Sequence, residues 1–521
     1  MTLSIPIPLI APTLLLAVSL MTLAQSGRRP GAFPRIAEAA AGAAVLLSLA
    51  GFAQLLIAGP VEFSAGAGLA LIAFNLDAVS ATMALLVSFV GWVVQRYSVT
   101  YLDGEEGEGA FHGLLLATLA AVLILVQAAS LPAFVLGFIA VGETLRRLLL
   151  FYGGREEAVR AAAKFRKVWR AGDVALVCAA VGFYAATGTM DIRQINLGAS
   201  EQVGVLFHVA VACLVLAAAL KTAAFPLHGW LTEVMESPTP VSALLHAGVI
   251  NAGGFLLIRL SDAVQASPGA MAALVLVGGL SALFGAVVML TQSAVKTALA
   301  WSTVSQMGFM LLQCGLGLWA LALLHIVAHS LYKAHAFLSS GTAIRNVMWA
   351  KRLGPVAAPG LTAVAKAFAL ALVLFALVAA GSHFLLGPKS AQSLALGAIL
   401  IFGVAYLVAQ GLADTAPGEL TRRTAAAATA AALSYFALQF LAGKLWGQHL
   451  AATPQAGSLE WALIVLAVAS FGLVAVAQSL FPLWAHHPAA AGLRVHVANG
   501  FYLNAIFDRL AGGFRTPTPS K

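Results

Sequence analysis

Charged side chains are scarce in this sequence. Of its 521 residues only 9% are Asp, Glu, Lys or Arg, whereas 61% are hydrophobic. A soluble globular domain carries roughly 25% charged residues, so the composition excludes that class. The mean hydropathy of +0.93 indicates an integral membrane protein. The formal net charge is +9, but the basic residues form no patch interleaved with aromatics, so we expect no nucleic acid as a partner.

Cysteine is almost absent as well. Cys178, Cys213 and Cys314 are isolated inside apolar segments, and no C-x-x-C spacing occurs. A disulfide framework, a cysteine metal site and an iron–sulfur cluster are therefore excluded. No G-x-G-x-x-G follows a predicted strand, so a dinucleotide site is not expected either. We interpret the cysteines as small buried apolar residues, and we expect neither catalysis by this chain nor a cofactor within it.

Long apolar runs, in contrast, fill the sequence. A membrane-spanning helix needs about 20 mostly apolar residues, and the N-terminal run lacks the charged region of a signal peptide. The prediction is an all-α polytopic membrane protein with about 15 transmembrane helices. Their expected ranges are 4–25, 36–58, 71–94, 111–129, 131–151, 172–189, 203–222, 238–260, 269–291, 295–315, 318–344, 360–386, 393–412, 424–442 and 459–481.

Basic residues concentrate in alternate loops. One set of loops holds Arg28, Arg29, Arg35, Arg96, Arg155, Arg160, Lys164, Arg166, Lys167, Arg170, Lys351, Arg352, Arg422 and Arg423. The positive-inside rule places this set in the cytoplasm. We therefore expect a cytoplasmic C-terminus and, with an odd number of spans, a periplasmic N-terminus. The tail 484–521 is mildly amphipathic and is expected at the cytoplasmic membrane surface or on a partner.

Lys221 ends a long apolar run and is followed by Pro226. A proline breaks the helix and frees backbone carbonyls, which is tolerated at membrane depth where protein or a water-filled cavity satisfies them. Broken helices are a feature of ion-coupled transporters, and a desolvated lysine releases its proton more readily. The alternative is a lysine that snorkels to the surface.

Four further ionisable residues lie in apolar segments. His246 precedes three glycines, and is either part of a proton relay or a hydrogen-bonded core residue. His325, His329 and Lys333 are spaced i, i+4 and i+8, which puts them on one helix face. Three ionisable groups one turn apart favour a stepwise proton path. Two histidines at i and i+4 can also bind a metal, but no carboxylate or cysteine accompanies them, so we expect none.

Two acidic residues have arginine neighbours. Glu143 is followed by Arg146 and Arg147 at i+3 and i+4, so it is either a helical ion pair or a carboxylate that tunes a lysine of the path. Arg170 and Asp173, in RAGD, are interpreted as a structural charge pair. Asp77, at the start of the third span, is either a helix cap or a buried acid.

The motif LKTAAFPLHGWLTEVMESPTPVSALLHAGVINAGGFLL, at 220–257, resembles the antiporter-like, proton-pumping subunits of respiratory complex I and of multisubunit cation/proton antiporters. KTALAWSTVSQMGFM and LLHIVAHSLYKAHAFLSSG fit the same pattern. The resemblance covers roughly 71–345. It implies an antiporter-like fold with broken helices and inverted repeats, and a path through Lys221, His246, His325, His329 and Lys333.

A narrower resemblance concerns YLDGEEGEGAFHGLLLATLAAVLILVQ and LLHAGVINAGGFLLIRL. Both are similar to the DabB family, the membrane subunits of DAB-type inorganic-carbon accumulation complexes. This resemblance implies a bacterial inner-membrane location and a large soluble DabA-like partner that binds zinc and resembles a β-carbonic anhydrase. Cation flow, of protons or Na⁺, would then drive hydration of CO2 to bicarbonate by that partner. With the antiporter-like core at 71–345, we expect four parts, at 1–70, 71–345, 346–483 and 484–521.

The sequence departs from the antiporter-like pattern at two places. The acidic residue expected on the fifth helix aligns near Ile139, one turn before Glu143, which leaves the usual glutamate–lysine pair open. The second broken helix of the relatives has no lysine or glutamate here, because 367–387 offers only His383, with Lys366 upstream. The remaining alternatives are a subunit of a cation/proton antiporter or of an NADH-quinone oxidoreductase-like complex, and a purely structural membrane anchor.

Overall fold

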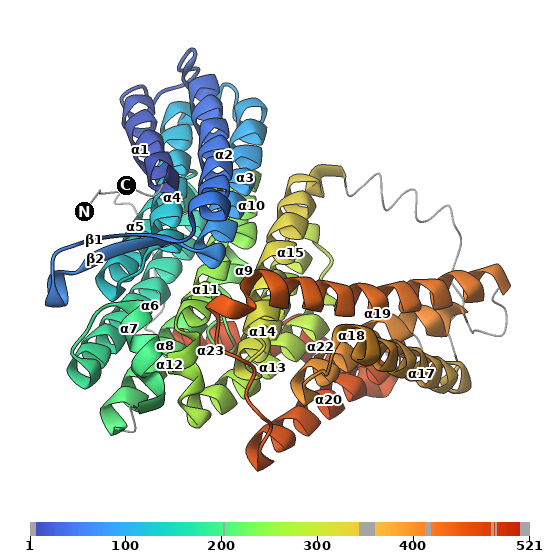
Figure 1. Ribbon diagram of the computed structural model, residues 1–521. Helices are drawn as coiled ribbons and strands as arrows, with labels where there is room; N and C mark the ends of the chain where they lie inside the picture. Colours follow the sequence, from blue (N-terminus) through green and yellow to red (C-terminus); the bar gives the residue numbers. More distant parts are fainter. Residues whose placement is uncertain are drawn as a thin grey trace.

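The computed structural model describes residues 7–201, 204–342, 360–411, 418–480, 484 and 487–510. Within them the chain forms a bundle of helices with one β-hairpin (Figure 1). The long helices are α1 (Ile10–Leu23), α2 (Phe33–Ala58), α3 (Ala78–Tyr101), α4 (Glu108–Gln127), α5 (Leu131–Leu149), α6 (Glu156–Thr187), α8 (Val205–Lys221), α13 (Pro268–Met289), α14 (Val295–Gly315), α15 (Trp319–Leu338), α17 (Leu361–Leu386), α18 (Ala391–Gly411), α19 (Gly418–Trp446) and α20 (Ser458–Ser479).

Every predicted span coincides with a helix in the structure. In the described part of the chain, ten helices are long and apolar enough to cross a membrane, and α1, α8 and α18 are shorter apolar helices. The remaining two, α5 and α14, carry more polar residues. The polytopic all-α prediction is therefore confirmed, while the number 15 is approximate. The predicted boundary near residue 345, Lys351 and Arg352, and residues 511–521 of the tail lie outside the described residues.

The third predicted span begins too early, because a hairpin precedes it. Strands β1 (Val61–Ala65) and β2 (Ile72–Leu76) pair antiparallel, with Val61 opposite Leu76. Gly66, at φ +82°, turns the chain where a Cβ would lie 2.4 Å from the carbonyl oxygen of Ala70. Residues 71–76 were expected in the span because the length of an apolar run alone does not separate a buried strand from a helix.

Two spans are interrupted. α8 ends at Lys221 and the chain resumes in the short helix α9 (Gly229–Glu233), with a cis Phe225–Pro226 peptide between them. The span predicted at 238–260 is also divided, into α10 (Thr239–Ala247), a 3₁₀ turn and α11 (Ala252–Arg259). The first break follows from Pro226, whereas the second occurs at Gly248 and was not predicted.

The C-terminal helices α17–α20 form a group beside the body made by α1–α15 (Figure 1). Their buried core is continuous with α13, α14 and α15, which contribute Val275, Leu312 and Leu321. The expected second break is not present in α17, which runs unbroken through Leu361–Leu386. Lys366 and His383 on this helix are exposed. They therefore do not supply the lysine or glutamate that the resemblance leads us to expect in a second broken helix.

The described part of the tail folds back onto the bundle. It contains α22 (Ala491–Ala498) and α23 (Leu503–Leu510). Asp508 of α23 forms ion pairs with Lys164 (2.6 Å) and Arg160 (2.9 Å) of α6, and Lys164 also contacts Glu233 of α9 at 2.9 Å. Lys164 is fully buried, so this lysine of the predicted cytoplasmic loop is instead part of a network that ties the tail to both helices.

Candidate functional site

Lys221 lies in an aromatic pocket at the first helix break. Its side chain is fully buried, with Nζ 2.6 Å from Oδ1 of Asp173 on α6. The ammonium also lies 4.2 Å from the ring centroid of Trp169 and 4.5 Å from that of Phe138, distances typical of cation–π contact. A buried lysine with a carboxylate partner does not snorkel, so that alternative is wrong.

The acidic partner of Lys221 is Asp173, and not Glu143, which the sequence suggested as a carboxylate beside a lysine of the path. Glu143 pairs with Arg146 (2.7 Å) and Arg147 (3.2 Å) on its own helix and is 37% exposed. Arg170 is exposed and makes no ion pair with Asp173 in the described part of the chain. The predicted Arg170–Asp173 charge pair is therefore wrong, because α6 packs along α8 and turns Asp173 toward the lysine.

His246 lies fully buried just before the second break. Its Nδ1 is 3.0 Å from Oγ1 of Thr303, and its ring stacks on Phe337 with centroids 4.4 Å apart. α10 ends at Ala247, so the carbonyl of His246 is among the last four of a helix, which lack intrahelical partners. Nε2 of His329 donates a hydrogen bond to that carbonyl at 2.9 Å.

The three residues on one face of α15 meet three polar residues of α14. Nδ1 of His325 lies 2.9 Å from Oε1 of Gln313, Nδ1 of His329 lies 2.8 Å from Oε1 of Gln306, and Nζ of Lys333 lies 2.8 Å from Oγ of Ser302. His329 and Lys333 are buried, and His325 is half-buried. His335 is exposed on the same helix. The predicted common face is confirmed.

One backbone carbonyl joins the lysine to His246. Lys333 donates to the carbonyl of Leu299 at 3.1 Å, and Oγ1 of Thr303 donates to the same oxygen at 3.0 Å. Thr303 then accepts from Nδ1 of His246. A hydrogen-bonded chain therefore runs from His246 through Thr303 to Lys333, and His329 attaches to it through the carbonyl of His246. We call these residues, with His325, the α14–α15 relay.

The glutamines suit histidines that change protonation. Nε2 of His329 must carry a proton to donate to a carbonyl, so its Nδ1 is bare in the neutral ring and protonated in the cation. A glutamine amide can face either form, because it presents oxygen to an N–H and NH₂ to a bare nitrogen. Gln306 and Gln313 can thus remain bonded to His329 and His325 in both states.

Lys221 stands apart from the relay. Its hydrogen bonds go to Asp173 and, at 3.5 Å, to the carbonyl of Trp169. None of the described contacts joins it to His246. The sequence prediction treated all five residues as one path, and the structure instead brings four of them together and leaves Lys221 at a neighbouring position.

Sequence reasoning missed several members of this site. The sequence predicts a structural role for Asp173, and it does not identify Thr303 or the polar residues of α14. Ser302, Gln306 and Gln313 are spaced i, i+4 and i+11, so their common face was a usable signal. Within the described residues, no three His, Cys, Asp or Glu side chains gather in a way that could hold a metal ion.

A second charged pair lies at the hairpin end of the bundle. Asp77 caps α3 by accepting from the Ser80 amide at 2.8 Å, and Nη1 of Arg259 lies 2.5 Å from its Oδ2. The helix-cap interpretation of Asp77 is therefore confirmed, and its side chain is largely but not fully buried, at 14% exposure. Burial alone would raise the pKa of Asp77, but Arg259 and the Ser80 bonds outweigh it and leave the pKa below the ordinary 3.8.

We expect Asp77→Asn to destabilise the protein at neutral pH. Removing one partner of a buried ion pair costs about 3–5 kcal/mol, and part of the helix cap weakens with it. A carboxylate with a depressed pKa contributes stability that is present above 3.8 and lost as pH falls through its folded-state value. The difference in thermal unfolding between wild type and variant, measured in detergent, should be large at pH 7 and shrink below about pH 4.

Glu62, exposed on the neighbouring strand, supplies the matched control Glu62→Gln, which should unfold like the wild type at both pH values. An Asp77→Asn penalty of equal size at pH 3 and pH 7 would contradict the assignment of the effect to the ion pair.

Comparison with known proteins places these features in context. Residues 128–413 match the family described as "NADH:quinone oxidoreductase/Mrp antiporter, TM", and residues 65–112 match "NADH-Ubiquinone oxidoreductase (complex I), chain 5 N-terminus". The chain is 38% identical over 475 residues to the probable inorganic carbon transporter subunit DabB2 of Halothiobacillus neapolitanus, covering 88% of this chain and 84% of that protein.

A second relative matches over part of its length, and two solved structures are similar in fold. The probable inorganic carbon transporter subunit DabB of Hydrogenovibrio crunogenus is 42% identical over 285 residues, about half of each chain (54% and 55%). The Mrp complex from Dietzia superposes with TM-score 0.60 at 21% identity, covering 98% of this chain and 60% of that one. Respiratory complex I from Thermus thermophilus gives 0.55 at 24%, covering 95% and 99%. These two likenesses concern the fold.

Proposed function

Since the chain belongs to the NADH:quinone oxidoreductase/Mrp antiporter family, and within it to the DabB-type inorganic carbon transporter subunits, we propose that it is the ion-conducting membrane subunit of an energy-coupled inorganic-carbon uptake complex. The observation that carries the proposal is the α14–α15 relay. Burying a lysine and two histidines inside a membrane bundle is costly unless they serve a function. A purely structural anchor would not need such a chain of hydrogen bonds.

Protons are the ion that this arrangement favours. The imidazoles and the lysine of the relay can accept and release a proton, and the Thr303 and Ser302 hydroxyls can bond to either protonation state of a neighbour. The carbonyls of Leu299 and His246 only accept hydrogen bonds, and they hold Lys333, Thr303 and His329 in position. The lysines carry the positive charge at two places: Lys221 is balanced by Asp173, whereas Lys333 faces a carbonyl and a hydroxyl and, in the described part of the chain, no carboxylate. A proton on Lys333 is therefore less stabilised by its surroundings and easier to pass on.

The ion gradient would supply the energy for uptake. One charge that crosses 100 mV releases about 2.3 kcal/mol, which shifts an equilibrium by more than about tenfold. In the complex, the chemistry belongs to a partner: a large soluble zinc-binding, DabA-like subunit that hydrates CO2 to bicarbonate and a proton. Hydration alone runs in both directions, so coupling to the gradient would keep bicarbonate on the cytoplasmic side.

The orientation we propose has the C-terminus in the cytoplasm of a bacterial inner membrane and the N-terminus in the periplasm. The basic loops support it, and so does the position of the tail, which lies on α6 and α9 at the end of the bundle that carries the basic loop after α5. The soluble partner would then dock on this basic end.

A subunit of a cation/proton antiporter or of an NADH-quinone oxidoreductase-like complex is the second candidate, because the family includes both. The unbroken α17, with Lys366 and His383 exposed, favours the first proposal, since antiporter-like relatives carry a charged residue in a second broken helix.

Purification of the chain from native membranes tests the proposal. We expect one large soluble protein to co-purify in stoichiometric amount and to contain zinc, measured by mass spectrometry and metal analysis. A series of further membrane subunits, or iron–sulfur proteins, would contradict the carbon-uptake function and support the second candidate.

A further inference from the structure

A large polar hollow of about 860 Å³ opens at the hairpin end of the bundle. Its wall is formed by β1, α7 (Ile192–Gly198), α11, α12 (Ser261–Gln265) and the 3₁₀ turn Gly447–His449. These segments lie far apart in the sequence, and the hairpin emerges from the same side of the bundle in Figure 1. In the proposed orientation this end faces the periplasm.

Acidic side chains predominate in the lining. Asp77 and Arg259 neutralise each other, which leaves Glu62, Asp191 and Asp262 against the single Arg193. A hollow lined by one sign of charge, with walls of low dielectric constant, raises the local concentration of ions of the opposite sign. The hollow therefore attracts cations.

The floor of the hollow is the ion pair between Arg259 and Asp77. Arg259 donates to Asp77 (2.5 Å) and to Oδ1 of Asn75 (2.9 Å), so β2, α3 and α11 are held together at this point. The Arg259 side chain is 8% exposed, although its residue lines the hollow. The pair is therefore mostly shielded from the hollow.

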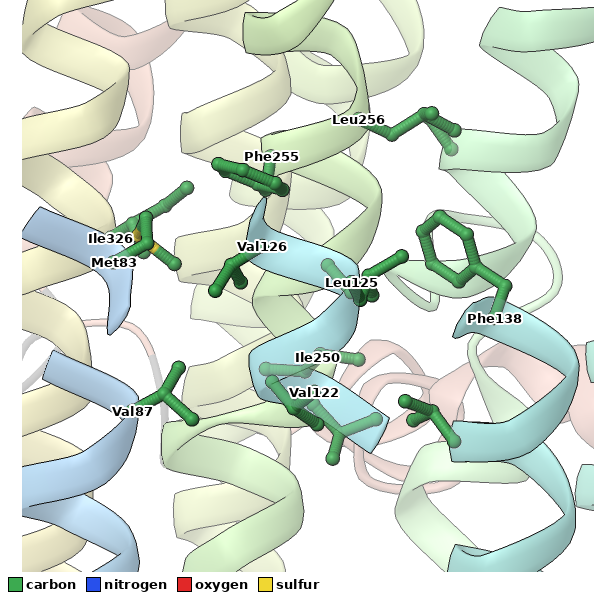
Figure 2. Close-up of a cluster of buried hydrophobic side chains, with 14 of the residues drawn as sticks. Met83, Val87, Val122, Leu125, Val126, Phe138, Ile250, Phe255, Leu256 and Ile326 are labelled. Carbon is green, nitrogen blue, oxygen red and sulfur yellow. The ribbon is translucent and has the colours of Figure 1, made fainter. Parts of the chain in front are cut away.

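An apolar layer lies beneath the pair. Phe255 is four residues before Arg259 on α11, about 6 Å along the axis at 1.5 Å per residue. Figure 2 shows it in a cluster of buried apolar side chains with Val126 and Ile326, and with Met83 and Val87 of α3. All of these side chains are buried. A hydrated ion cannot cross this layer without conformational change.

Below the layer, the path reaches the relay. Asn251, about 12 Å from Arg259 by the same rise, donates to Oγ of Ser330 at 3.0 Å, next to His329. Its Oδ1 is buried without a hydrogen-bond partner, and Asn251 and Ser330 line a small cavity of about 20 Å³. That volume is enough for one water molecule, which the free oxygen could bind.

We propose that the hollow is the outer vestibule of the ion path, that it gathers small hydrated monovalent cations, and that the Asp77–Arg259 pair is its inner limit. The inference rests on the proposed function and adds to it the mouth of the path and the charge class that enters. The order from outside to inside is the acidic vestibule, the ion pair, the apolar layer, the one-water cavity with Asn251, and the relay.

Thiol labelling with reagents of opposite charge tests the vestibule. Cys178, Cys213 and Cys314 are first replaced by serine, and Ser200→Cys then places a thiol in the lining, where Ser200 is exposed. Intact cells are treated from outside with methanethiosulfonate reagents that carry either a trimethylammonium or a sulfonate group. We expect the cationic reagent to react at least about tenfold faster, because of the acidic field, and the ratio to fall with added salt.

Ser458→Cys, exposed at the start of α20 and outside the lining, is the matched control, and its two rates should be similar. A thiol beneath the limit is supplied by Val126→Cys, a near-isosteric change, and it should resist both reagents. Equal rates at Ser200→Cys, a faster anionic reagent, or rapid labelling of Val126→Cys would each overturn the proposal.

Carbon uptake measured in the same cells separates this proposal from the proposed function. Complete labelling of Ser200→Cys by the cationic reagent should reduce gradient-driven uptake by more than half, while labelled Ser458→Cys keeps it. Uptake that persists after complete labelling overturns the vestibule. If the unlabelled parent shows no gradient-dependent uptake at all, the proposed function fails, whatever the labelling pattern.

Discussion

Lys221→Met should abolish coupled carbon uptake while the protein still assembles with its partner. Methionine keeps most of the volume of the side chain but carries no proton, so a step that needs a charged lysine at the helix break is lost. Loss of a proton-transfer group costs about 100-fold or more in rate. The measurement is uptake of labelled inorganic carbon by cells that depend on this complex, together with the yield of the purified complex.

The ion pair complicates the single variant, because Asp173 is left as a buried carboxylate without its partner. Such a loss destabilises by about 3–5 kcal/mol. The double variant Lys221→Met/Asp173→Asn removes both charges and should recover assembly without recovering uptake. Lys444→Met is the matched control, since Lys444 is exposed on α19, and it should behave as wild type. Full uptake in the double variant would sink the assignment of Lys221 to the ion path.

His329→Ala and Lys333→Ala should each reduce uptake by a similar factor, about 100-fold or more. His329 connects the carbonyl of His246 to Gln306, and Lys333 connects Leu299 to Ser302, so either change interrupts the relay. Uptake driven by an imposed pH gradient in right-side-out vesicles that retain the partner reports the loss directly.

His335→Ala is the matched control on the same helix, because this histidine is exposed and makes no part of the relay. It should leave uptake unchanged. If His329→Ala and His335→Ala gave the same modest decrease, the effect would reflect damage to α15 in general, and the relay would lose its support.

Local patterns in the sequence were sufficient to predict the long helices and the common face of His325, His329 and Lys333. Apolar runs of about 20 residues predicted every long helix, because the thickness of the hydrocarbon core sets the length that a spanning helix needs. The i, i+4, i+8 spacing of His325, His329 and Lys333 placed them on one face because helical geometry is fixed. Pro226 predicted a break because proline lacks the backbone N–H that a helix interior needs.

Features that depend on how helices pack against each other could not be predicted in this way. Asp173 and Lys221 are 48 positions apart, and their contact follows from the packing of α6 against α8. Glu143 lies closer in sequence to the position of the acidic residue in the antiporter-like pattern. In the structure, however, it pairs with Arg146 and Arg147 of its own helix. The break at Gly248 contains no proline, so the sequence gives no signal for it. The burial of Lys164 depends on α23, which lies more than 330 residues further along the chain.

The link between α10 and α15 has an unusual property, because its acceptor is the main-chain carbonyl of His246. A side-chain acceptor disappears with a single codon change, whereas a peptide oxygen is present whatever residue occupies the position. Substitution at residue 246 can therefore remove the imidazole and still leave His329 bonded. A genetic screen for loss of function can therefore identify His329 but not this oxygen. The contribution of the main chain would be visible through backbone chemistry, such as replacement of the amide by an ester.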